Sequence, residues 1–318
     1  MDNSSAKVTI IVPIYNGESF IDRCIKSVLS QTYKDYILVL VNDGSTDNSG
    51  LICSEYASKY SNIIYISKEN GGEGSARNAG LNVVKTEYVT FLDCDDELPM
   101  DALDIYLKSI RKTDMVVGGL YKREKNRVKT YNPEARTVSG TANIVDTIIS
   151  DMYFINGICS KLYKSDILLK YGCKFNDFKY GEDTYFVYTY LKHVSSITFV
   201  NKPVYSVNVT AGSLSLSNVR EPWKYMKEVY SLGKSLDPSN SYIRSQLLLR
   251  CIKTTLLLEA RNGKLPFLRS CKDMELFVNE EKIICVKGKY NSLILRLLKK
   301  EKFIMLYRII KGRILLSI

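Results

Sequence analysis

The first 120 residues alternate continuous apolar runs with segments whose apolar residues recur at helical spacing. The run VTIIVPIYN, residues 8–16, has the length and composition of a strand buried on both faces of a parallel sheet. Residues 21–29 then place Ile21, Cys24, Ile25 and Val28 on one helical face. With further strands expected at 36–41, 63–67 and 88–93, and helices at about 46–59 and 74–84, the pattern predicts a doubly wound α/β fold.

The regular alternation weakens after residue 114. One more strand is expected at 114–121, and the basic stretch KREKNRVK, residues 122–129, is typical of a loop or hairpin. After about residue 217 the pattern turns helical, and the segment 242–263 ends in Asn262 and Gly263, which favour a helix stop. We therefore expect an α/β domain over residues 1–216 and a helical region over 217–318.

The positive charge of the chain is concentrated at its C-terminal end. Of the 318 residues, 45 are Lys or Arg and 34 are Asp or Glu, which gives +11, and residues 286–318 hold nine basic residues and one acid. This tail mixes its charges with Leu, Ile, Phe and Met, so it can form a basic amphipathic helix on an anionic membrane surface. The alternative, a helix packed on the rest of the chain with a solvated basic face, stays open. No nucleic-acid module is apparent, so we expect no nucleic-acid partner.

Cysteine and histidine usage excludes several kinds of site. The eight cysteines include no CxxC pair and no regular spacing, so we interpret them as reduced core residues of a cytosolic protein. His193 is the single histidine, which excludes His-rich zinc sites and leaves one residue for any Ser-His-Asp triad. The start MDNSSAK and the absence of a long uncharged apolar stretch predict neither a signal peptide nor a membrane-spanning helix.

Polar clusters follow three successive predicted strands. They are NDGSTD at residues 42–47, KENGGEGSARN at 68–78 and DCDDE at 93–97. Doubly wound sheets bind ligands at the carboxyl ends of their strands. Three loops are therefore expected around one pocket.

Two of these clusters are compatible with a nucleotide ligand. Asp43 ends a strand before a tight turn, so its carboxylate can accept from a nucleobase N–H or a ribose hydroxyl, although an ordinary helix cap fits the same pattern. The Gly-rich turn before Arg77 leads into a helix, where backbone N–H groups and the guanidinium favour phosphate. The segment lacks the glycine spacing of a dinucleotide fingerprint, and no P-loop motif occurs.

The remaining clusters are acidic. Asp93, Asp95 and Asp96 fall within four positions, where mutual repulsion is unfavourable unless a cation lies among them. Oxygen ligands of this kind suit Mg²⁺ or Mn²⁺ bound jointly with a diphosphate, whereas Asp96 alone can be a helix cap. Glu182 and Asp183 precede a predicted helix, and they are either its acidic first turn or a pair that includes a general base.

Taken in order, these motifs resemble the family 2 glycosyltransferases of the GT-A fold, which are inverting enzymes of bacterial surface polysaccharide synthesis. The resemblance runs over residues 7–215 and is carried by VPIYN, SVLSQTY, NDGSTDNS, the Asn70-x-Gly72 and ARN-x-GL segments, FLDCDDEL, KLYKSDIL and GEDTYF. The common spelling DDGS is NDGS here, because Asn42 departs from the pattern while Asp43 keeps it. The implied architecture is a Rossmann-like nucleotide-binding sheet with a helical C-terminal extension.

The resemblance implies roles for individual residues. Asp93 and Asp95 would form the DxD motif that contacts the ribose and the Mn²⁺ or Mg²⁺ ion. Asp183 would be the catalytic base, with Glu182 beside it on the acceptor side. The nucleotide-sugar site would comprise Pro13, Tyr15, Asp43, Asn70, Gly72, Arg77 and Asp93.

The resemblance also implies a reaction and a setting. Residues 1–216 would catalyse metal-dependent transfer of a hexose or N-acetylhexosamine from a nucleotide sugar, by family habit a UDP-sugar, with residues 7–100 binding the donor and 101–216 the acceptor. The acceptor would be a glycan or lipid-linked oligosaccharide of capsule, exopolysaccharide or cell wall, reached from the cytoplasmic face of the membrane. Two alternatives remain: an inactive nucleotide-sugar-binding partner subunit, and a haloacid-dehalogenase-like phosphatase, whose motif Glu97 does not match.

Overall fold

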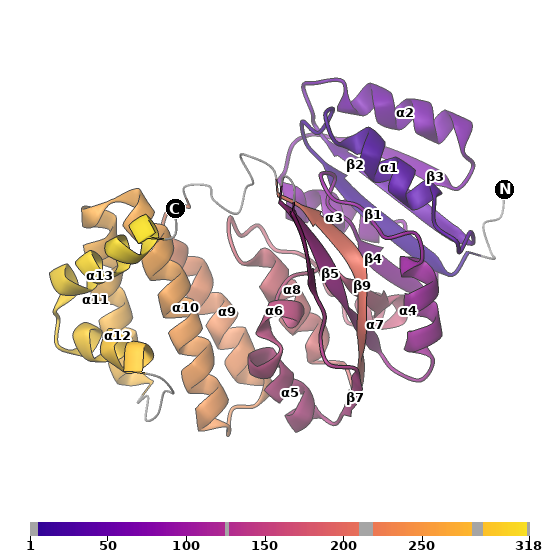
Figure 1. Cartoon of the computed structure of the whole chain (residues 1–318). Helices are drawn as coiled ribbons and strands as arrows, with labels where there is room; N and C mark the ends of the chain where they lie inside the picture. The colour runs from indigo at the N-terminus through magenta and orange to yellow at the C-terminus, as the bar shows by residue number, and fades with distance from the viewer. Residues whose placement is uncertain (1–5, 125–126, 210–218, 282–288, 317–318) are drawn as a thin grey trace. The chain divides into compact units, whose positions relative to one another are not determined.

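The computed structural model describes residues 6–124, 127–209, 219–281 and 289–316 (Figure 1). The chain forms two compact units, of which the first comprises residues 1–177 and 182–213, and the second residues 178–181 and 214–318. The boundary expected at residue 216 falls in 210–218, outside the described residues.

The first unit alternates strands and helices, as the hydrophobic pattern predicts. Its N-terminal elements are β1 (Val8–Ile14), α1 (Ile21–Leu29), β2 (Tyr36–Asp43), α2 (Ser49–Lys59), β3 (Ile63–Lys68), α3 (Glu73–Leu81), β4 (Tyr88–Phe91) and α4 (Ala102–Ile110). The elements that follow are β5 (Met115–Glu124), β6 (Arg127–Tyr131), β7 (Arg136–Ser139), α5 (Thr141–Ser150), α6 (Met152–Ile155), β8 (Lys161–Lys164), α7 (Ser165–Lys170), α8 (Glu182–Leu191) and β9 (Ser196–Asn208).

One mixed sheet forms the centre of this unit. Its strand order is β3-β2-β1-β4-β8-β5-β9-β7, with β6 paired to β5. The first four strands in this order are parallel, whereas β8 runs antiparallel between β4 and β5. The parallel half brings the carboxyl ends of β1, β2, β3 and β4 to one edge of the sheet, where the polar clusters follow.

The two faces of β1 bury different helices. Val8, Ile10 and Val12 belong to a core shared with buried residues of α1, α2 and α4. On the other face Ile11 lies under α3, where a Cβ on Gly80 would stand only 2.5 Å from Ile11 Cγ2. Every residue of β1 and β2 is buried, which explains their uninterrupted apolar runs.

Several boundaries differ from the expected ones for local reasons. The helix expected from Thr46 begins at Ser49, because the Thr46 amide donates to Asn16 Oδ1 while Asp47 Oδ1 accepts from the Ser49 amide. Asp96 caps no helix, since its Oδ1 accepts from the Asn208 amide at 2.8 Å. The basic stretch at 122–129 is part of an antiparallel β5–β6 pair, and residues 125–126 lie outside the described residues.

The second unit is helical, with α9 (Pro222–Leu236), α10 (Ser241–Asn262), α11 (Lys264–Glu280), α12 (Lys289–Lys299) and α13 (Phe303–Leu316). The helix α10 ends before Gly263, whose φ of +122° lies in the left-handed region that glycine tolerates. Among the described residues, no helix is both long and apolar enough to cross a membrane.

The C-terminal tail packs within the second unit. Leu306 and Ile310 of α13 are buried, and α13 contacts α10, α11 and α12. Two of its cations serve this packing, since Lys311 Nζ donates to the Ala260 carbonyl at 3.1 Å and the Arg313 guanidinium lies 3.9 Å from the Tyr290 ring centroid. Much of the apolar side of the tail is therefore covered by neighbouring helices, although Ile304 and Met305 of α13 remain exposed.

Candidate active site

The Asp43 carboxylate joins the loop after β2 to the loop after β3. This carboxylate is 2% exposed, and Lys68 Nζ lies 2.6 Å from its Oδ1. The Gly71 and Gly72 amides also donate to it, at 3.0 Å to Oδ1 and 2.7 Å to Oδ2 respectively. Asp43 thus shapes the Gly-rich turn, in addition to the ligand contact that the sequence suggests. Gly44, at φ +71°, supplies the bend that follows.

The loop after β1 is tied to the loop after β2. The Asn16 amide donates to Ser45 Oγ at 3.0 Å, and the Gly17 amide donates to Ser49 Oγ at 2.9 Å. Pro13 is buried in β1, whereas the Tyr15 side chain beside it is 51% exposed. An exposed ring on a braced loop can stack on a planar ligand.

Asn70 and Gly72 lie in the turn that Asp43 closes. Asn70 is exposed, and its backbone amide lies 2.8 Å from where a Cβ on Gly44 would stand. Gly72 adopts φ +87° immediately before α3. The structure therefore places Asp43, Asn70 and Gly72 together, as the sequence predicts.

The acidic segment after β4 forms a turn. The Asp96 amide donates to the Asp93 carbonyl at 3.0 Å, so the chain reverses at Cys94 and Asp95. The Tyr205 hydroxyl accepts from the Asp93 amide at 3.1 Å and anchors the start of this turn on β9. Burial, together with the nearby Asp93 carboxylate, raises the pKa of Asp95 and raises the pKa of Asp96 to about 8.

Arg77 joins the two acidic motifs that the sequence separates by 90 positions. Its guanidinium is 1% exposed, with Nη2 2.9 Å from Asp93 Oδ1 and Nη1 3.0 Å from Asp183 Oδ1. Glu73 Oε2 lies 3.4 Å from Nη2, and the guanidinium carbon lies 5.4 Å from the Phe175 ring centroid. Arg77 was expected to contact phosphate, but in this structure its terminal nitrogens face carboxylates. Its buried Nε has no hydrogen-bond partner among the described residues.

Glu182 and Asp183 form the first turn of α8, as the sequence predicts. Burial raises the pKa of Asp183 above its ordinary value, and the neighbouring Arg77 opposes that rise. Burial and the Asp183 charge raise the pKa of Glu182 to about 7. A carboxylate with a raised pKa is a stronger proton acceptor near neutral pH than an exposed one.

The position of α3 is fixed by an amide pair. Asn78 Nδ2 donates to the Phe175 carbonyl at 2.8 Å, and the Phe175 amide donates back to Asn78 Oδ1 at 2.9 Å. Asn78 lies one residue after Arg77, so this pair holds the guanidinium beside the segment that leads to α8. In the motif ARN, Arg77 therefore supplies the charge, and Asn78 supplies the hydrogen bonds that hold it in place.

Three residues of this cluster were not singled out from the sequence. Glu73 contacts Arg77, Cys159 Sγ lies 3.4 Å from Asp93 Oδ2, and Lys161 is a buried cation near Asp183. Cys159 and Lys161 lie next to β8 or within it, and only the sheet order brings β8 beside β4. The one signal in the sequence was the motif KLYKSDIL, which begins with Lys161.

The metal ligands can be assessed by their chemistry. Within the described part of the chain, no group of three or more His, Cys, Asp or Glu side chains could hold a metal ion. Asp93 and Asp95 offer hard oxygen donors on one turn, which fits an ion that takes its other ligands from a diphosphate and water. The residues present therefore fit an ion held jointly by the protein and a diphosphate, and they do not form a complete set of protein ligands.

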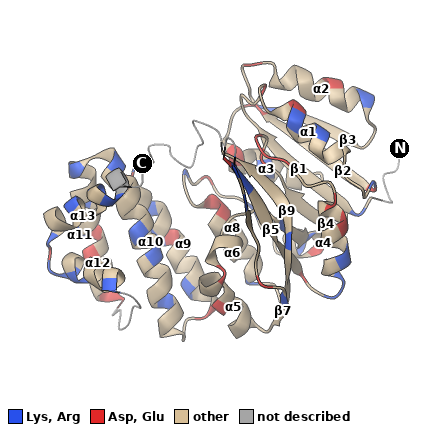
Figure 2. Cartoon of the chain, in the orientation of Figure 1, with Lys and Arg blue, Asp and Glu red and all other residues tan. Residues whose placement is uncertain are grey.

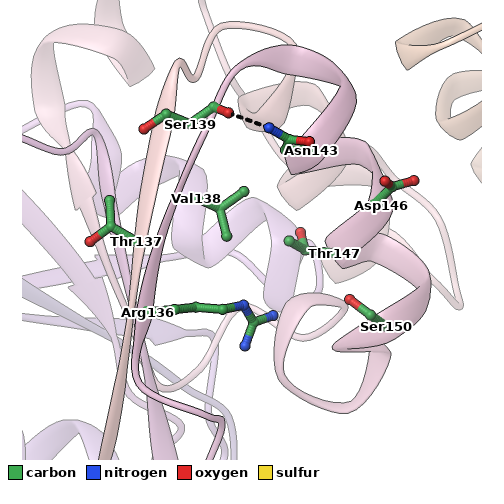
Figure 3. Close-up of a pocket in the computed structure, with 8 residues that line it drawn as sticks. All are labelled: Arg136, Thr137, Val138, Ser139, Asn143, Asp146, Thr147 and Ser150. Atoms are coloured by element: carbon green, nitrogen blue, oxygen red, sulfur yellow. Dashed lines mark hydrogen bonds between the residues drawn. The ribbon is translucent and has the colours of Figure 1, made fainter.

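A surface hollow of about 360 Å³ lies between β7 and α5, away from these motifs (Figure 3). No predicted site residue lines it. Its cation, Arg136, already contacts the Asp151 carboxylate and the Glu134 carbonyl. We assign no role in the reaction to this hollow.

The chain matches the model of one protein family over half of its length. The model of "Glycosyl transferase family 2" matches residues 9–167. Glycosyltransferase GlyA of Streptococcus pneumoniae is 34% identical over 220 residues, which are 66% of this chain and 31% of GlyA. A poly(ribitol-phosphate) beta-glucosyltransferase of Bacillus spizizenii is 29% identical over 272 residues, covering 81% of this chain and 39% of that protein. The chain thus spans about a third of the length of these two relatives.

A solved structure shares the fold. TarS residues 1–349 of S. aureus, crystallised with UDP-GlcNAc, matches with a TM-score of 0.74 at 19% identity, covering 98% of this chain and 92% of that one. The expected GT-A architecture with C-terminal helices is confirmed.

Proposed function

Because the chain belongs to glycosyltransferase family 2, we propose that it transfers a hexose or N-acetylhexosamine from a UDP-sugar to a hydroxyl of a glycan acceptor. One observation carries this proposal: the Arg77 guanidinium contacts both Asp93, in the acidic turn after β4, and Asp183, in the first turn of α8. Donor chemistry and proton removal can then occur in one place. UDP is favoured because the TarS structure of the same fold was solved with UDP-GlcNAc.

The donor nucleotide would bind at the carboxyl ends of β1 to β4. The exposed Tyr15 ring on its braced loop, with Pro13 behind it, would lie against the base. Asp43 and the turn of Asn70 and Gly72 would offer polar groups to the base and ribose, and Asp93 would contact the ribose. Arg77 would keep its contacts to Asp93 and Asp183 while the diphosphate enters.

Asp95, with Asp93, would hold Mn²⁺ or Mg²⁺ together with the donor diphosphate. Such an ion, when bound, stabilises negative charge on the leaving diphosphate. Burial and the Asp93 charge raise the pKa of Asp95, and a cation bound there would favour its ionised form.

Asp183 would act as the catalytic base, with Glu182 on the acceptor side. The acceptor hydroxyl gives its proton to Asp183 while its oxygen forms a bond to the anomeric carbon and the bond to the diphosphate oxygen breaks. This single displacement inverts the anomeric centre and requires no covalent intermediate. Arg77 orients the Asp183 carboxylate through its Oδ1.

The acceptor would be a glycan of cell wall or capsule, and lipid-linked. The names of the relatives support a bacterial polymer acceptor, since one of them is a poly(ribitol-phosphate) beta-glucosyltransferase. The enzyme would work at the cytoplasmic face of the cell membrane, where the basic C-terminal tail would contact the lipid. Residues 1–216 would be catalytic and 217–318 accessory.

A panel of nucleotide sugars, with Mn²⁺ or with EDTA, tests the proposal by release of nucleoside diphosphate in the presence of a membrane extract. We expect metal-dependent release from one donor.

Asp95→Asn should lose the metal-dependent rate, and Asp183→Asn should bind the donor and transfer about 100-fold more slowly. Donor binding without release in the wild type would instead support an inactive partner subunit, and near-normal transfer by Asp183→Asn would exclude that residue as the base.

A further inference from the structure

The turn at residues 156–160 is held by hydrogen bonds along its whole length. It connects α6 to β8, and each of its five carbonyl oxygens accepts from a named donor. In chain order the donors are Thr184 Oγ1 at 2.9 Å, Lys161 Nζ, Tyr163 Oη at 3.1 Å, Lys161 Nζ at 3.1 Å and the Gly118 amide at 2.9 Å. A short irregular segment held at every carbonyl has little freedom to change shape.

Lys161 supplies two of these five bonds. Its side chain lies in the interior, with the residue 1% exposed, and its own carbonyl accepts from Thr90 Oγ1 at 2.8 Å. An ammonium group in such a place is unfavourable unless its hydrogen bonds and charge are compensated. The Gly157 and Cys159 carbonyls supply acceptors, and the charge of Asp183 acts on the same ammonium.

The turn contacts both halves of the proposed active site. On one side Cys159 Sγ lies 3.4 Å from Asp93 Oδ2. On the other side Asn156 accepts from two residues of α8, through its carbonyl from Thr184 and through its Oδ1 from the Tyr188 hydroxyl at 2.9 Å. Thr184 directly follows Asp183. The turn therefore links the acidic turn after β4 to the first turn of α8.

We propose that Lys161 is a positioning residue of the transfer reaction: its ammonium holds the 156–160 turn, which fixes the Asp93 carboxylate relative to α8, and its buried charge acts on Asp183. The inference rests on the proposed function. Lys161 contacts neither donor nor acceptor in this role, and acts through Cys159 and Asn156.

The electrostatics agree with this role. Burial lowers the pKa of Lys161 to about 7, and Cys159 and Asp183 oppose that fall. Arg77 and Lys161 lower the pKa of Asp183 and Asp93 raises it. Two further carboxylates, Glu182 and Glu73, also interact with the Asp183 charge. Removal of the Lys161 charge therefore raises the pKa of Asp183, and more of the base is protonated at a given pH.

Lys161→Met in the full chain tests the inference, with Lys164→Met as a matched control. Lys164 lies on the same strand and pairs with Asp114 at 3.0 Å, away from the cluster. We expect Lys161→Met to lower kcat about tenfold or more, to change the donor KM less than about threefold, and to move the acidic limb of the kcat–pH profile upward by about one pH unit. Lys164→Met should change none of these.

Lys161→Gln separates geometry from charge. Its amide can still donate to a carbonyl but carries no charge, so it should recover part of kcat while the acidic limb stays displaced. If both variants lost kcat but kept the acidic limb of the wild-type kcat–pH profile, Lys161 would have a structural role only. That outcome would overturn the inference.

Hydrogen–deuterium exchange gives a readout that needs no turnover. Amides of residues 156–160 and 182–188 should exchange faster in Lys161→Met than in the wild type, and at wild-type rates in Lys164→Met. Unchanged exchange in Lys161→Met would overturn the positioning role. If the wild type released no nucleoside diphosphate from any donor, the proposed function would fail, and the exchange result would still decide the structural link.

Discussion

At the scale of single residues, Arg77 is the charge that allows several carboxylates to lie together. Its two terminal nitrogens contact Asp93 and Asp183 at about the same distance, and both carboxylates are roughly one third exposed. A planar guanidinium can bridge two carboxylates in a way that a lysine ammonium cannot. The Gly-rich turn before Arg77 marked this residue as functional in the sequence. Its partner Asp183 lies 106 positions away, so local spacing could not predict their contact.

Arg77→Met is expected to destabilise the first unit. Its removal takes away the guanidinium that contacts both Asp93 and Asp183. Breaking a buried ion pair costs about 3–5 kcal/mol, and less here because the carboxylates reach solvent. We expect a loss of about 2–3 kcal/mol in the free energy of unfolding, measured by urea denaturation. Arg23→Met is the control, since Arg23 pairs with Glu97 at the surface and should cost less than about 1 kcal/mol.

Glu182 should make stability depend on pH in an uncommon direction. Its folded-state pKa of about 7 lies above its ordinary value of 4.5, so the folded state holds a proton that the unfolded state has lost between these values. The free energy of unfolding should therefore fall as pH rises from about 4.5 to about 7.

Glu182→Gln removes this titration, so the variant should be more stable than the wild type at pH 8 and nearly equal to it at pH 4.5. The measurement is the melting temperature across this range. Glu228→Gln, at an exposed position on α9, should leave the pH profile as it is in the wild type. A Glu182→Gln profile parallel to the wild-type one would contradict the raised pKa.

At the scale of elements, the strands of the parallel half were predictable and the insertion of β8 was not. Because β1 and β2 are buried on both faces, each appears in the sequence as a continuous apolar run. β8 has four residues, two of them lysines, and it pairs with β4 across more than 70 positions. Its place in the sheet follows from long-range packing, which local periodicity does not encode. Two of the three residues missed at the site, Cys159 and Lys161, lie next to β8 or within it, and the third, Glu73, lies in α3.

The approach of α3 to β1 depends on Gly80. A methyl group there would stand 2.5 Å from Ile11 Cγ2 and would push α3, with Arg77, away from the sheet. We expect Gly80→Ala to lower the free energy of unfolding by about 1–3 kcal/mol and to weaken donor binding, measured by denaturation and calorimetry.

Gly312→Ala is the matched control for this substitution. Gly312 also lies in a helix, α13, but a Cβ there would meet nothing within 4 Å. Alanine should therefore stabilise that helix by about 0.5–1 kcal/mol through its better helix propensity. A loss of stability in both variants would show that packing against Ile11 is not the cause.

At the scale of the whole molecule, the two units differ sharply in charge. The second unit holds 22 Lys and Arg against 9 Asp and Glu, whereas the first holds 23 against 25. Figure 2 shows basic positions along α10 to α13. The C-terminal basicity was evident from the sequence, but the fold of the tail was not, because the same apolar residues suit a lipid surface or the neighbouring helices.

We expect the full chain to sediment with vesicles of anionic lipid at low salt and to be released as salt rises to about 0.5 M, because screened charges attract weakly. Lys299→Glu with Lys300→Glu, at the exposed last residue of α12 and the exposed residue after it, should reduce this binding. Arg111→Glu with Lys112→Glu, exposed in the first unit, should not. Equal binding to neutral vesicles would contradict an electrostatic contact.

The interior thiols provide reporters of folding that need no label. Cys24 and Cys53 lie in the core of the first unit, and Cys251 and Cys271 in that of the second. Burial raises the pKa of the last two and of Cys53 to about 12, so the reactive thiolate is scarce in the native state. A thiol reagent can reach them only when the surrounding structure opens. Their modification rates, followed one peptide at a time in rising denaturant, should therefore show whether the two units unfold together or in succession.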